Sequence, residues 1–343
     1  MINMLSDTQT LPTEQMIEAI TKVQLGDDVY SLDPSTKELE RLAAEKMGKE
    51  SAMFVPSGTM GNLCAIMAHT DRGDEVILEA DSHIYYYETG GFALAGLSPR
   101  LVIGNKGVLD PDAVERTLRE PNIHYPKTSL LCIENTHNRA GGTITSPERT
   151  RELCDLAHEK GLKVHIDGAR IFNAAVALGV NVTDLVGPAD SVMFCLSKGL
   201  SCPVGSVLAG SKEFIDKARR VRKLLGGGMR QVGVLSAAGI VALETMIERL
   251  SEDHRNARVL AEGLSKLPGI SIDMTTVQTN IVQFDVSQLG ISAREFAALL
   301  KAQGLLVSTR PPTRIRMVTN RHIESSHVAD ALQIVTQVIN ELN

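Results

Sequence analysis

Short apolar runs separated by longer amphipathic segments fill the first 250 residues. The runs are SAMFV (51–55), EVIL (75–78), RLVI (100–103), SLLCIE (129–134), KVHID (163–167), SVMFCL (191–196) and GSVLAG (205–210). Short runs that are rich in branched apolar side chains are typical of buried strands. Because helical segments separate several of them, the pattern predicts an α/β fold with a mostly parallel central sheet and helices on both faces.

Residues 34–48 (PSTKELERLAAEKMG) show the helical pattern clearly. Apolar side chains recur there at helical spacing and share one face, namely Leu39, Leu42, Ala43 and Met47. We expect Ser35 to cap the start of this helix and Glu38 to complete a capping box.

The pattern changes near residue 250. Helices are predicted at 251–269, 292–304 and 324–342, and strands at 280–286, 305–309 and 314–318. We therefore expect a large domain over residues 1–250, which includes an N-terminal segment, and a small C-terminal α+β domain over 251–343.

Composition and charge narrow the class of function. Hydrophobic residues make up 43% of the 343 residues and charged residues 22%, which is ordinary for a folded globular protein. The net charge of -6 provides no basic patch for nucleic acid. No run reaches the roughly 18 apolar residues of a membrane helix, and the N-terminus lacks a signal-peptide pattern. The five cysteines form no CxxC pair and are expected to be reduced. We therefore expect a cytoplasmic protein that binds a small-molecule ligand and has no nucleic-acid partner, no membrane partner and no metal.

A single lysine ends one of the predicted strands. Residues 191–206 (SVMFCLSKGLSCPVGS) lead an apolar run directly into Lys198. A buried ammonium group is costly unless it is paired or loses its proton, so Lys198 needs a partner, water or a covalent use. A lone lysine at a strand end is usually just solvated.

Other polar residues follow further strand ends. Asp167 and Arg170 lie in HIDGAR, where open α/β sheets collect ligands. Gly58 and Thr59 follow SAMFV and would offer backbone N–H groups to a phosphate at a helix N-terminus, and His83 follows EVIL. Each alone has a plain structural interpretation, as a cap, a turn or a packed imidazole.

Together these residues match the needs of one cofactor. Pyridoxal 5′-phosphate needs a lysine for its aldehyde, an acid that keeps its pyridine nitrogen protonated, and amides for its phosphate. The order of the strand ends therefore predicts a pyridoxal phosphate site, with Lys198 as the amine that binds the cofactor.

Colinear motifs over essentially the whole chain resemble the threonine aldolase family of fold-type I pyridoxal phosphate enzymes. They are SDTQT (6–10), GDDVY (26–30), FVPSGTMGN (54–62), ENTHN (134–138), HIDGAR (165–170), CLSKGL (195–200) and GGGMRQ (226–231). The resemblance implies the fold of the pyridoxal phosphate-dependent transferases. It also implies a homotetramer made of two close dimers that share active sites.

The resemblance assigns cofactor-binding roles to individual residues. Lys198 matches the lysine bonded to the cofactor, Asp167 the partner of the pyridine nitrogen, and His83 the imidazole stacked on the ring. Gly58 and Thr59 match the phosphate loop. Further cofactor contacts are implied for Ser197, Lys223 and Arg230, the last two reaching the phosphate of a neighbouring subunit. Without the family, a solvated basic helix end is the preferred interpretation of Lys223 and Arg230.

Substrate-binding roles are also implied. Ser6, Arg170 and Arg316 match the groups that hold the amino-acid carboxylate, for which the planar fork of arginine is well suited. His124 matches a histidine near the substrate hydroxyl, and Tyr30 a tyrosine that lines a neighbour's site. Departures from the family pattern are Leu5, where arginine is common, and Asn320, where histidine is common.

The implied reaction is the retro-aldol cleavage of L-threonine or L-allo-threonine to glycine and acetaldehyde. His83 and His124 are both candidates for the base that takes the hydroxyl proton, and the sequence does not decide between them. Alternatives on the same scaffold are a β-eliminating lyase, a transaldolase or a hydroxymethyl-transferring enzyme. A non-catalytic ligand-binding protein is a further alternative, although the lysine, the acid and both arginines are all present.

Overall fold

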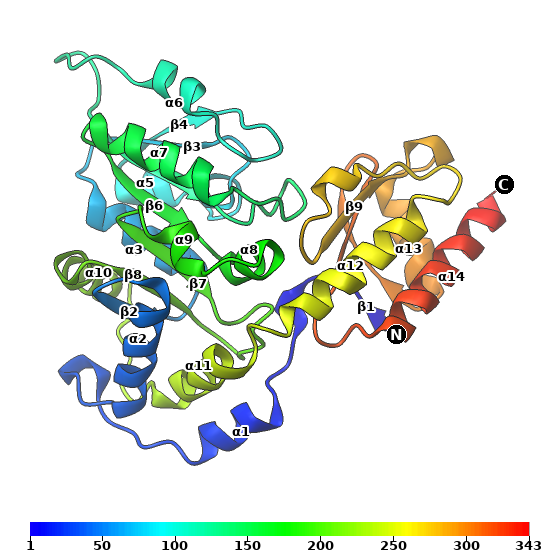
Figure 1. Ribbon diagram of the computed structural model, residues 1–343, viewed down its shortest axis with the longest axis horizontal. Helices are drawn as coiled ribbons and strands as arrows, with labels where there is room; N and C mark the ends of the chain where they lie inside the picture. Colours follow the sequence, from blue (N-terminus) through cyan, green and yellow to red (C-terminus); the bar gives the residue numbers. More distant parts are fainter. Residues whose placement is uncertain (343) are drawn as a thin grey trace.

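The computed structural model describes residues 1–342 and has two lobes (Figure 1). The larger lobe contains a seven-stranded sheet, and the smaller lobe contains a three-stranded antiparallel sheet. Helix α12 (Leu250–Leu264) runs from one lobe to the other. The N-terminus lies beside the small lobe, next to the C-terminal helix α14 (Ser325–Leu342).

The strands follow the apolar runs of the sequence. Those of the large sheet are β2 (Ser51–Val55), β3 (Glu75–Glu79), β4 (Ser98–Val102), β5 (Thr128–Glu134), β6 (Lys163–Asp167), β7 (Ser191–Cys195) and β8 (Ser206–Gly210). The others are β1 (Ile2–Asn3), β9 (Ile281–Asp285), β10 (Leu305–Leu306), β11 (Ser308–Arg310) and β12 (Arg314–Val318). Every strand predicted in the large lobe is confirmed.

The order of strands in the large sheet is β2-β8-β7-β6-β5-β3-β4. Strands β7, β6, β5, β3 and β4 run parallel to their neighbours in that order, and β8 is antiparallel to both β7 and β2. This confirms a mostly parallel sheet. Because the parallel strands point the same way, their carboxyl ends meet at one edge of the sheet.

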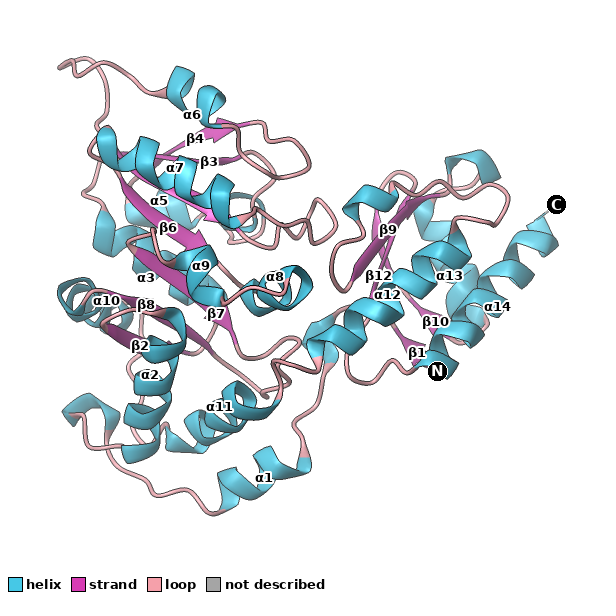
Figure 2. Ribbon diagram, viewed as in Figure 1, coloured by secondary structure: helices cyan, strands magenta, loops and turns pink. Residues whose placement is uncertain are grey.

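Helices cover both faces of this sheet (Figure 2). The helices other than α12 and α14 are α1 (Glu14–Thr21), α2 (Pro34–Met47), α3 (Gly58–His69), α4 (His83–Tyr86), α5 (Gly91–Ala95), α6 (Pro111–Thr117), α7 (Pro147–Glu159), α8 (Ile171–Leu178), α9 (Val182–Val186), α10 (Lys212–Leu224), α11 (Gly233–Thr245) and α13 (Ala293–Ala302). One large apolar core joins α2, α7, α8 and α11 to one face of the sheet, and α3 and α10 pack on the other face.

The cap of α2 differs from the sequence-based expectation. The side chain of Asp33, not Ser35, accepts a hydrogen bond from the N–H of Thr36 at 2.9 Å, and Pro34 occupies the first helical position. The hydroxyl of Ser35 instead donates to the carbonyl of Gln24 at 3.4 Å. The prediction of Ser35 as N-cap was wrong because proline suits the first turn, which makes the residue before it the cap.

Two segments of the chain connect the lobes: helix α12 and the N-terminal segment. Leu250, at the start of α12, belongs to the large core, whereas Leu260 and Leu264 belong to the core of the small lobe. Strand β1 pairs in parallel with β10, and Met4 is fully buried in the same small core. The first residues of the chain therefore pack with its last quarter. The boundary at residue 250 stays a prediction.

Among the described residues, no helix is both long enough and apolar enough to cross a membrane.

Candidate active site

A cavity of about 370 Å³ opens at the carboxyl edge of the large sheet. Its wall includes predicted site residues from separate strand ends, namely Gly58, Thr59, His83, Asp167, Ser197 and Lys198. The strand order explains this convergence, because β6 and β7 are neighbours and the loop after β2 reaches the same edge. The structure thus brings together the residues predicted to hold the cofactor.

Asp167 forms the floor of the cavity and is 1% exposed. Its Oδ2 accepts a hydrogen bond from Nδ2 of Asn62 at 3.0 Å, and its Oδ1 accepts one from the N–H of Ala169 at 3.1 Å. Asn62 also donates from Nδ2 to Oε1 of Glu88 at 2.8 Å. One amide therefore stands between two buried carboxylates and donates to both.

His83 is oriented by Glu88. Its Nδ1 lies 2.9 Å from Oε1 of Glu88, and its backbone N–H donates to Oε2 of Glu134 at 2.5 Å. Burial opposes the charged imidazole, but the hydrogen bond to Glu88 and the negative charge of Asp167 outweigh it and raise the pKa of His83. Burial and the charge of Asp167 raise the pKa of Glu88. A carboxylate that fixes one nitrogen of a histidine leaves the other nitrogen to face a reactant.

The N-terminus of α3 forms another wall of the cavity. Ser57 caps it by accepting a hydrogen bond from the N–H of Met60. The N–H groups of Gly58 and Thr59 form no hydrogen bond with any described residue. A Cβ at Gly58 would lie 2.9 Å from Sγ of Cys195, so only glycine allows the helix to approach β7 this closely. Free amides at a helix N-terminus suit a phosphate.

Lys198 lies in the loop between β7 and β8, and the backbone on both sides of it is fixed. Its carbonyl accepts hydrogen bonds from the hydroxyl of Thr10 and the N–H of Ser201, each at 2.8 Å. Its side chain lines the cavity together with Asp167 and His83. The lysine is therefore held at the position that the sequence predicted.

The arginines predicted to bind the substrate carboxylate, Arg170 and Arg316, lie around a buried acid, Asp7. Asp7 is fully buried and accepts hydrogen bonds from Nε and Nη2 of Arg170, both at 2.7 Å. Oδ1 of Asn138 accepts a hydrogen bond from Nη2 of Arg316 at 3.1 Å and one from Nη1 of Arg170 at 3.4 Å. Arg316 also donates from Nη1 to the carbonyl of Leu5 at 3.2 Å, and its buried Nε has no partner among the described residues.

The two arginines therefore differ in charge balance. Burial alone would raise the pKa of Asp7, but Arg170 and the charges of Lys198 and Arg316 hold it well below its usual range. Burial, together with the positive charge of Arg170, lowers the pKa of Arg316 to about 9. Arg170 is paired with a carboxylate within the chain, whereas Arg316 is buried and hydrogen-bonded only to the neutral groups of Leu5 and Asn138. Ser6 reaches this cluster through Asp7, whose Oδ1 lies 3.5 Å from its hydroxyl, and the same hydroxyl accepts a hydrogen bond from the N–H of Thr8.

Seven residues with predicted roles do not border this cavity: Ser6, Arg170 and Arg316 belong to the adjacent cluster around Asp7, and the other four are exposed. Tyr30 is 71% exposed, and His124 lies in the exposed loop between α6 and β5. Lys223 and Arg230 are exposed as well, and Nη1 of Arg230 lies 3.2 Å from Oδ2 of Asp27. None of the four belongs to the wall of the site within one chain.

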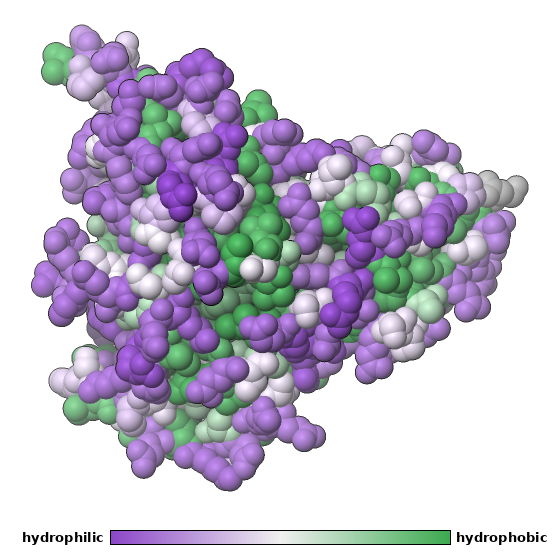
Figure 3. Space-filling view, in the orientation of Figure 1, coloured by the Kyte–Doolittle hydropathy of each residue, from purple (hydrophilic) through white to green (hydrophobic). Residues whose placement is uncertain are grey.

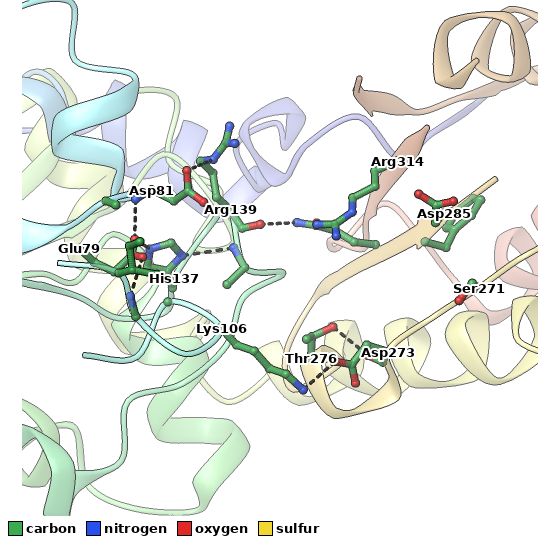
Figure 4. Close-up of a pocket in the computed structure, with 17 residues that line it drawn as sticks. Glu79, Asp81, Lys106, His137, Arg139, Ser271, Asp273, Thr276, Asp285 and Arg314 are labelled. Atoms are coloured by element: carbon green, nitrogen blue, oxygen red, sulfur yellow. Dashed lines mark hydrogen bonds and ion pairs between the residues drawn. The ribbon is translucent and has the colours of Figure 1, made fainter. Parts of the chain in front are cut away.

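A larger cavity of about 630 Å³ lies between the lobes and contains none of the predicted site residues (Figure 4). Most of its charged side chains pair with one another. Nε2 of His137 lies 2.9 Å from Glu79, and Nζ of Lys106 lies 2.6 Å from Asp273. Because most of these charges are already matched, the smaller cavity is the better candidate for a ligand.

Pyridoxal 5′-phosphate fits the groups of the smaller cavity. The free N–H groups of α3 suit its phosphate, the Asp167 carboxylate suits a protonated ring nitrogen, and the Lys198 amine suits its aldehyde. These N–H groups form a phosphate cradle whose position depends on Gly58, because a larger residue there would press α3 away from Sγ of Cys195.

The sequence missed four residues that complete the site: Asp7, Asn62, Glu88 and Asn138. Three of them lie within recognised motifs, namely Asp7 in SDTQT, Asn62 in FVPSGTMGN and Asn138 in ENTHN, whereas Glu88 comes five residues after His83. The motifs around them were a signal, but their partners are far away in sequence; Arg170, for example, follows Asp7 by 163 positions.

Comparison with known proteins finds relatives over nearly the whole chain. Residues 3–287 match the model of the β-eliminating lyase family. The chain is 45% identical to low-specificity L-threonine aldolase 1 of Arabidopsis thaliana, over 98% of this chain and 96% of that protein. It is 40% identical to the low specificity L-threonine aldolase of Escherichia coli strain K12, over 96% of this chain and 97% of that protein.

A solved structure of Leishmania major threonine aldolase has the same fold. The two structures superpose with a TM-score of 0.86 at 19% identity. The match covers 99% of this chain and 100% of that chain. At this identity the structural likeness supports the fold alone, and the family rests on the sequence relatives. The chain belongs to the β-eliminating lyase family and, within it, to the low-specificity L-threonine aldolases.

Proposed function

We propose that the protein cleaves L-threonine and L-allo-threonine to glycine and acetaldehyde, with pyridoxal 5′-phosphate as cofactor. One observation carries the proposal: Lys198, Asp167 and the free N–H groups of α3 surround one cavity, and the uncompensated Arg316 belongs to the adjacent cluster around Asp7. The family membership gives this arrangement its reaction.

When bound, the cofactor supplies a ring that takes up the electron pair of the breaking bond. Lys198 would hold its aldehyde, Asp167 its ring nitrogen, and Gly58 and Thr59 its phosphate. Asp167 is suited to this role because it is 1% exposed and is held by two N–H donors.

Arg316 would bind the substrate carboxylate and so set the orientation of the Cα–Cβ bond. Its buried guanidinium has only the neutral partners Leu5 and Asn138, so a carboxylate gains a charge-assisted pair there. Arg170, already paired with Asp7, would support this site by fixing Asn138. Bond cleavage releases the hydroxyl-bearing carbon as acetaldehyde, and Cα regains a proton to give glycine.

His83 is our candidate for the group that takes the hydroxyl proton within one chain. Its imidazole lines the cavity, and Glu88 fixes its Nδ1. His124 of the same chain is exposed outside the cavity, so it would serve only the site of another copy.

We further propose that the active protein is a homo-oligomer, a tetramer of close dimers. Exposed apolar side chains cluster in the N-terminal segment, namely Leu11, Ile17, Leu25, Val29, Tyr30 and Leu32. Hydrophobic side chains also reach the surface over α8 and around α11 (Figure 3). Contiguous exposed apolar surface is typical of protein interfaces.

Two of the exposed residues with predicted partner roles, Tyr30 and Arg230, lie in one region of that surface. The N–H of Asp28 donates to the carbonyl of Arg230 at 3.0 Å, and Oδ2 of Asp28 lies 2.8 Å from Nη2 of Arg222. These contacts place Tyr30 next to the loop that carries Arg230. A second copy docked here would receive both side chains.

The predicted cytoplasmic location is also part of the proposal. All five cysteines are buried and free, which suits a reducing compartment.

Product analysis tests the proposed reaction. The protein is loaded with pyridoxal phosphate and incubated with L-threonine, and acetaldehyde is followed through alcohol dehydrogenase while glycine is quantified. Equal amounts of both products support retro-aldol cleavage. Ammonia and a keto acid would instead identify β-elimination and overturn the proposal. The Lys198→Ala variant is the control, and it should release neither product.

A further inference from the structure

A chain of hydrogen bonds continues from Asp167 into the protein, away from the cavity. Oδ1 of Asn62 lies 3.1 Å from Nε2 of His165, and Nδ1 of His165 lies 2.9 Å from Oγ of Ser191. Oγ of Ser191 in turn lies 2.8 Å from Nε2 of His69. Asn62, His165 and Ser191 are all 0% exposed, and neither histidine borders the cofactor cavity.

The secondary structure aligns these groups in a row. His165 and Asp167 are two residues apart on β6 and therefore point to the same face of the sheet. Ser191 of β7 is the register partner of His165. Asn62 and His69 are separated by about 10 Å along α3, since each residue advances the helix by about 1.5 Å. One face of α3 thus spans from Asp167 to Ser191.

Both histidines of the row are neutral at ordinary pH. Burial, with a smaller contribution from His69, lowers the pKa of His165 to about 3, and burial lowers the pKa of His69 to about 4. A neutral imidazole has one N–H and one acceptor nitrogen. His69 also stacks on Phe214, with ring centroids 4.2 Å apart, which holds its ring in place.

The direction of every hydrogen bond then follows from the two carboxylates. Asn62 must turn its NH₂ group toward Asp167 and Glu88, because ionised carboxylates only accept. Its oxygen must then accept from Nε2–H of His165. Nδ1 of His165 is left as an acceptor for the Ser191 hydroxyl, whose oxygen accepts from Nε2–H of His69. In every bond of the series, the donor is the group farther from Asp167 and the acceptor is the group nearer to it.

We propose that His165, Ser191 and His69 are positioning residues for the reaction, which act by locking the Asn62 amide toward Asp167. Linked donors polarise one another in a buried environment. Asn62 therefore holds two adjacent carboxylates in place and offers Asp167 an N–H at fixed geometry. Without the row, the amide could turn its oxygen toward the carboxylates, and Asp167 would lose its orientation toward the ring nitrogen. The inference rests on the proposed function, in which Asp167 holds that nitrogen.

The tautomer of His165 tests the row without substrate or cofactor. The apoprotein is labelled with ¹⁵N-histidine, and a long-range ¹H–¹⁵N correlation spectrum is recorded between pH 6 and 9, with His165→Leu for assignment. We expect a neutral ring with its proton on Nε2 throughout. A charged ring, or a proton on Nδ1, would reverse the row and overturn the inference.

Two variants then test its effect on the site. His165→Leu leaves the Asn62 oxygen without a donor, and Ser191→Ala removes a middle link. We expect kcat to fall about tenfold in the first, the cost of one unsatisfied buried group, and about threefold in the second, with KM nearly unchanged. Ser236→Ala is the matched control, because Ser236 is 0% exposed and bonds Thr36 outside the site.

A spectroscopic readout separates positioning from general stability. With ¹⁵N-labelled pyridoxal phosphate bound, the ring-nitrogen resonance should shift toward the unprotonated value in both row variants and stay unchanged in the Ser236 control. Equal kcat and resonance in Ser191→Ala and the control would overturn the inference. Failure of the wild-type protein to cleave threonine would count against the proposed function alone, because the tautomer experiment uses no substrate.

Discussion

Replacing Asp7 with asparagine removes the negative charge from the arginine cluster while nearly preserving the shape of the side chain. Asp7 is fully buried and receives two 2.7 Å hydrogen bonds from Arg170, together with a 3.2 Å bond from Nδ2 of Asn280. The variant would keep one acceptor oxygen and leave Arg170, 7% exposed, without a counter-charge.

Breaking a buried ion pair by removing one partner typically costs about 3–5 kcal/mol. We therefore expect Asp7→Asn to lower the free energy of unfolding by about this amount at pH 7. Equilibrium urea unfolding at fixed protein concentration measures it. Glu18→Gln, which disrupts the exposed Lys22–Glu18 pair, serves as a control with no measurable change.

The pH dependence gives an independent check on the same contact. The pKa of Asp7 is depressed in the folded protein, so its stabilising contribution is present above the unfolded pKa of about 3.9 and is lost as the pH falls below it. At pH 3 the wild type should have lost about 1.3 kcal/mol of this contribution, whereas the asparagine cannot titrate. The difference between the two proteins should shrink by that amount from pH 7 to pH 3. A difference below about 1 kcal/mol at pH 7, or one that is constant with pH, would refute an ionised Asp7 paired with Arg170.

Three further predictions follow from the helix cap, the partner surface and the phosphate cradle. Asp33→Ala should destabilise the protein by about 1 kcal/mol through loss of the α2 cap, whereas Ser35→Ala should be nearly neutral in thermal unfolding; the reverse order would restore Ser35 as the cap. Inactive Lys198→Ala and Arg230→Ala proteins, mixed after partial dissociation, should regain threonine cleavage, because hybrid pairs contain one intact site; no recovery would place Arg230 outside the shared site. Gly58→Ala should weaken pyridoxal phosphate binding at least tenfold in a spectroscopic titration, since its Cβ would press on Sγ of Cys195, and unchanged affinity would argue against the cradle.

The strands were predictable because each is a short apolar run buried by helices on both faces. The same regularity placed Lys198 and Asp167 at one edge, since the carboxyl ends of β6 and β7 are neighbours in a parallel sheet. The Asp33 cap was missed because Ser35 offered an equally good local pattern. Local pattern also could not reveal that Asp7 neutralises Arg170, because that pairing depends on how the N-terminal segment crosses between the lobes.

The row behind Asp167 shows a similar limit of sequence reasoning. His165 stands two residues before Asp167 within a recognised motif, and alternation alone predicts that both face one side of β6. The partner of His165 comes from α3, 103 residues earlier. Sequence periodicity indicates which face a side chain occupies, but the choice of helix that covers that face is made by the tertiary fold.

The pairing of β1 with β10 constrains the order in which the protein can fold during its synthesis. Ile2 is made well before its partner Leu305, which follows it by 303 positions in the chain. The large sheet, with Lys198 and Asp167, can assemble well before that point, because its final strand ends at Gly210. The start of the segment that carries Asp7 therefore has no strand partner until β10 has been made. A ribosome stalled before β10 would display a cofactor cradle whose substrate-binding half has not yet formed.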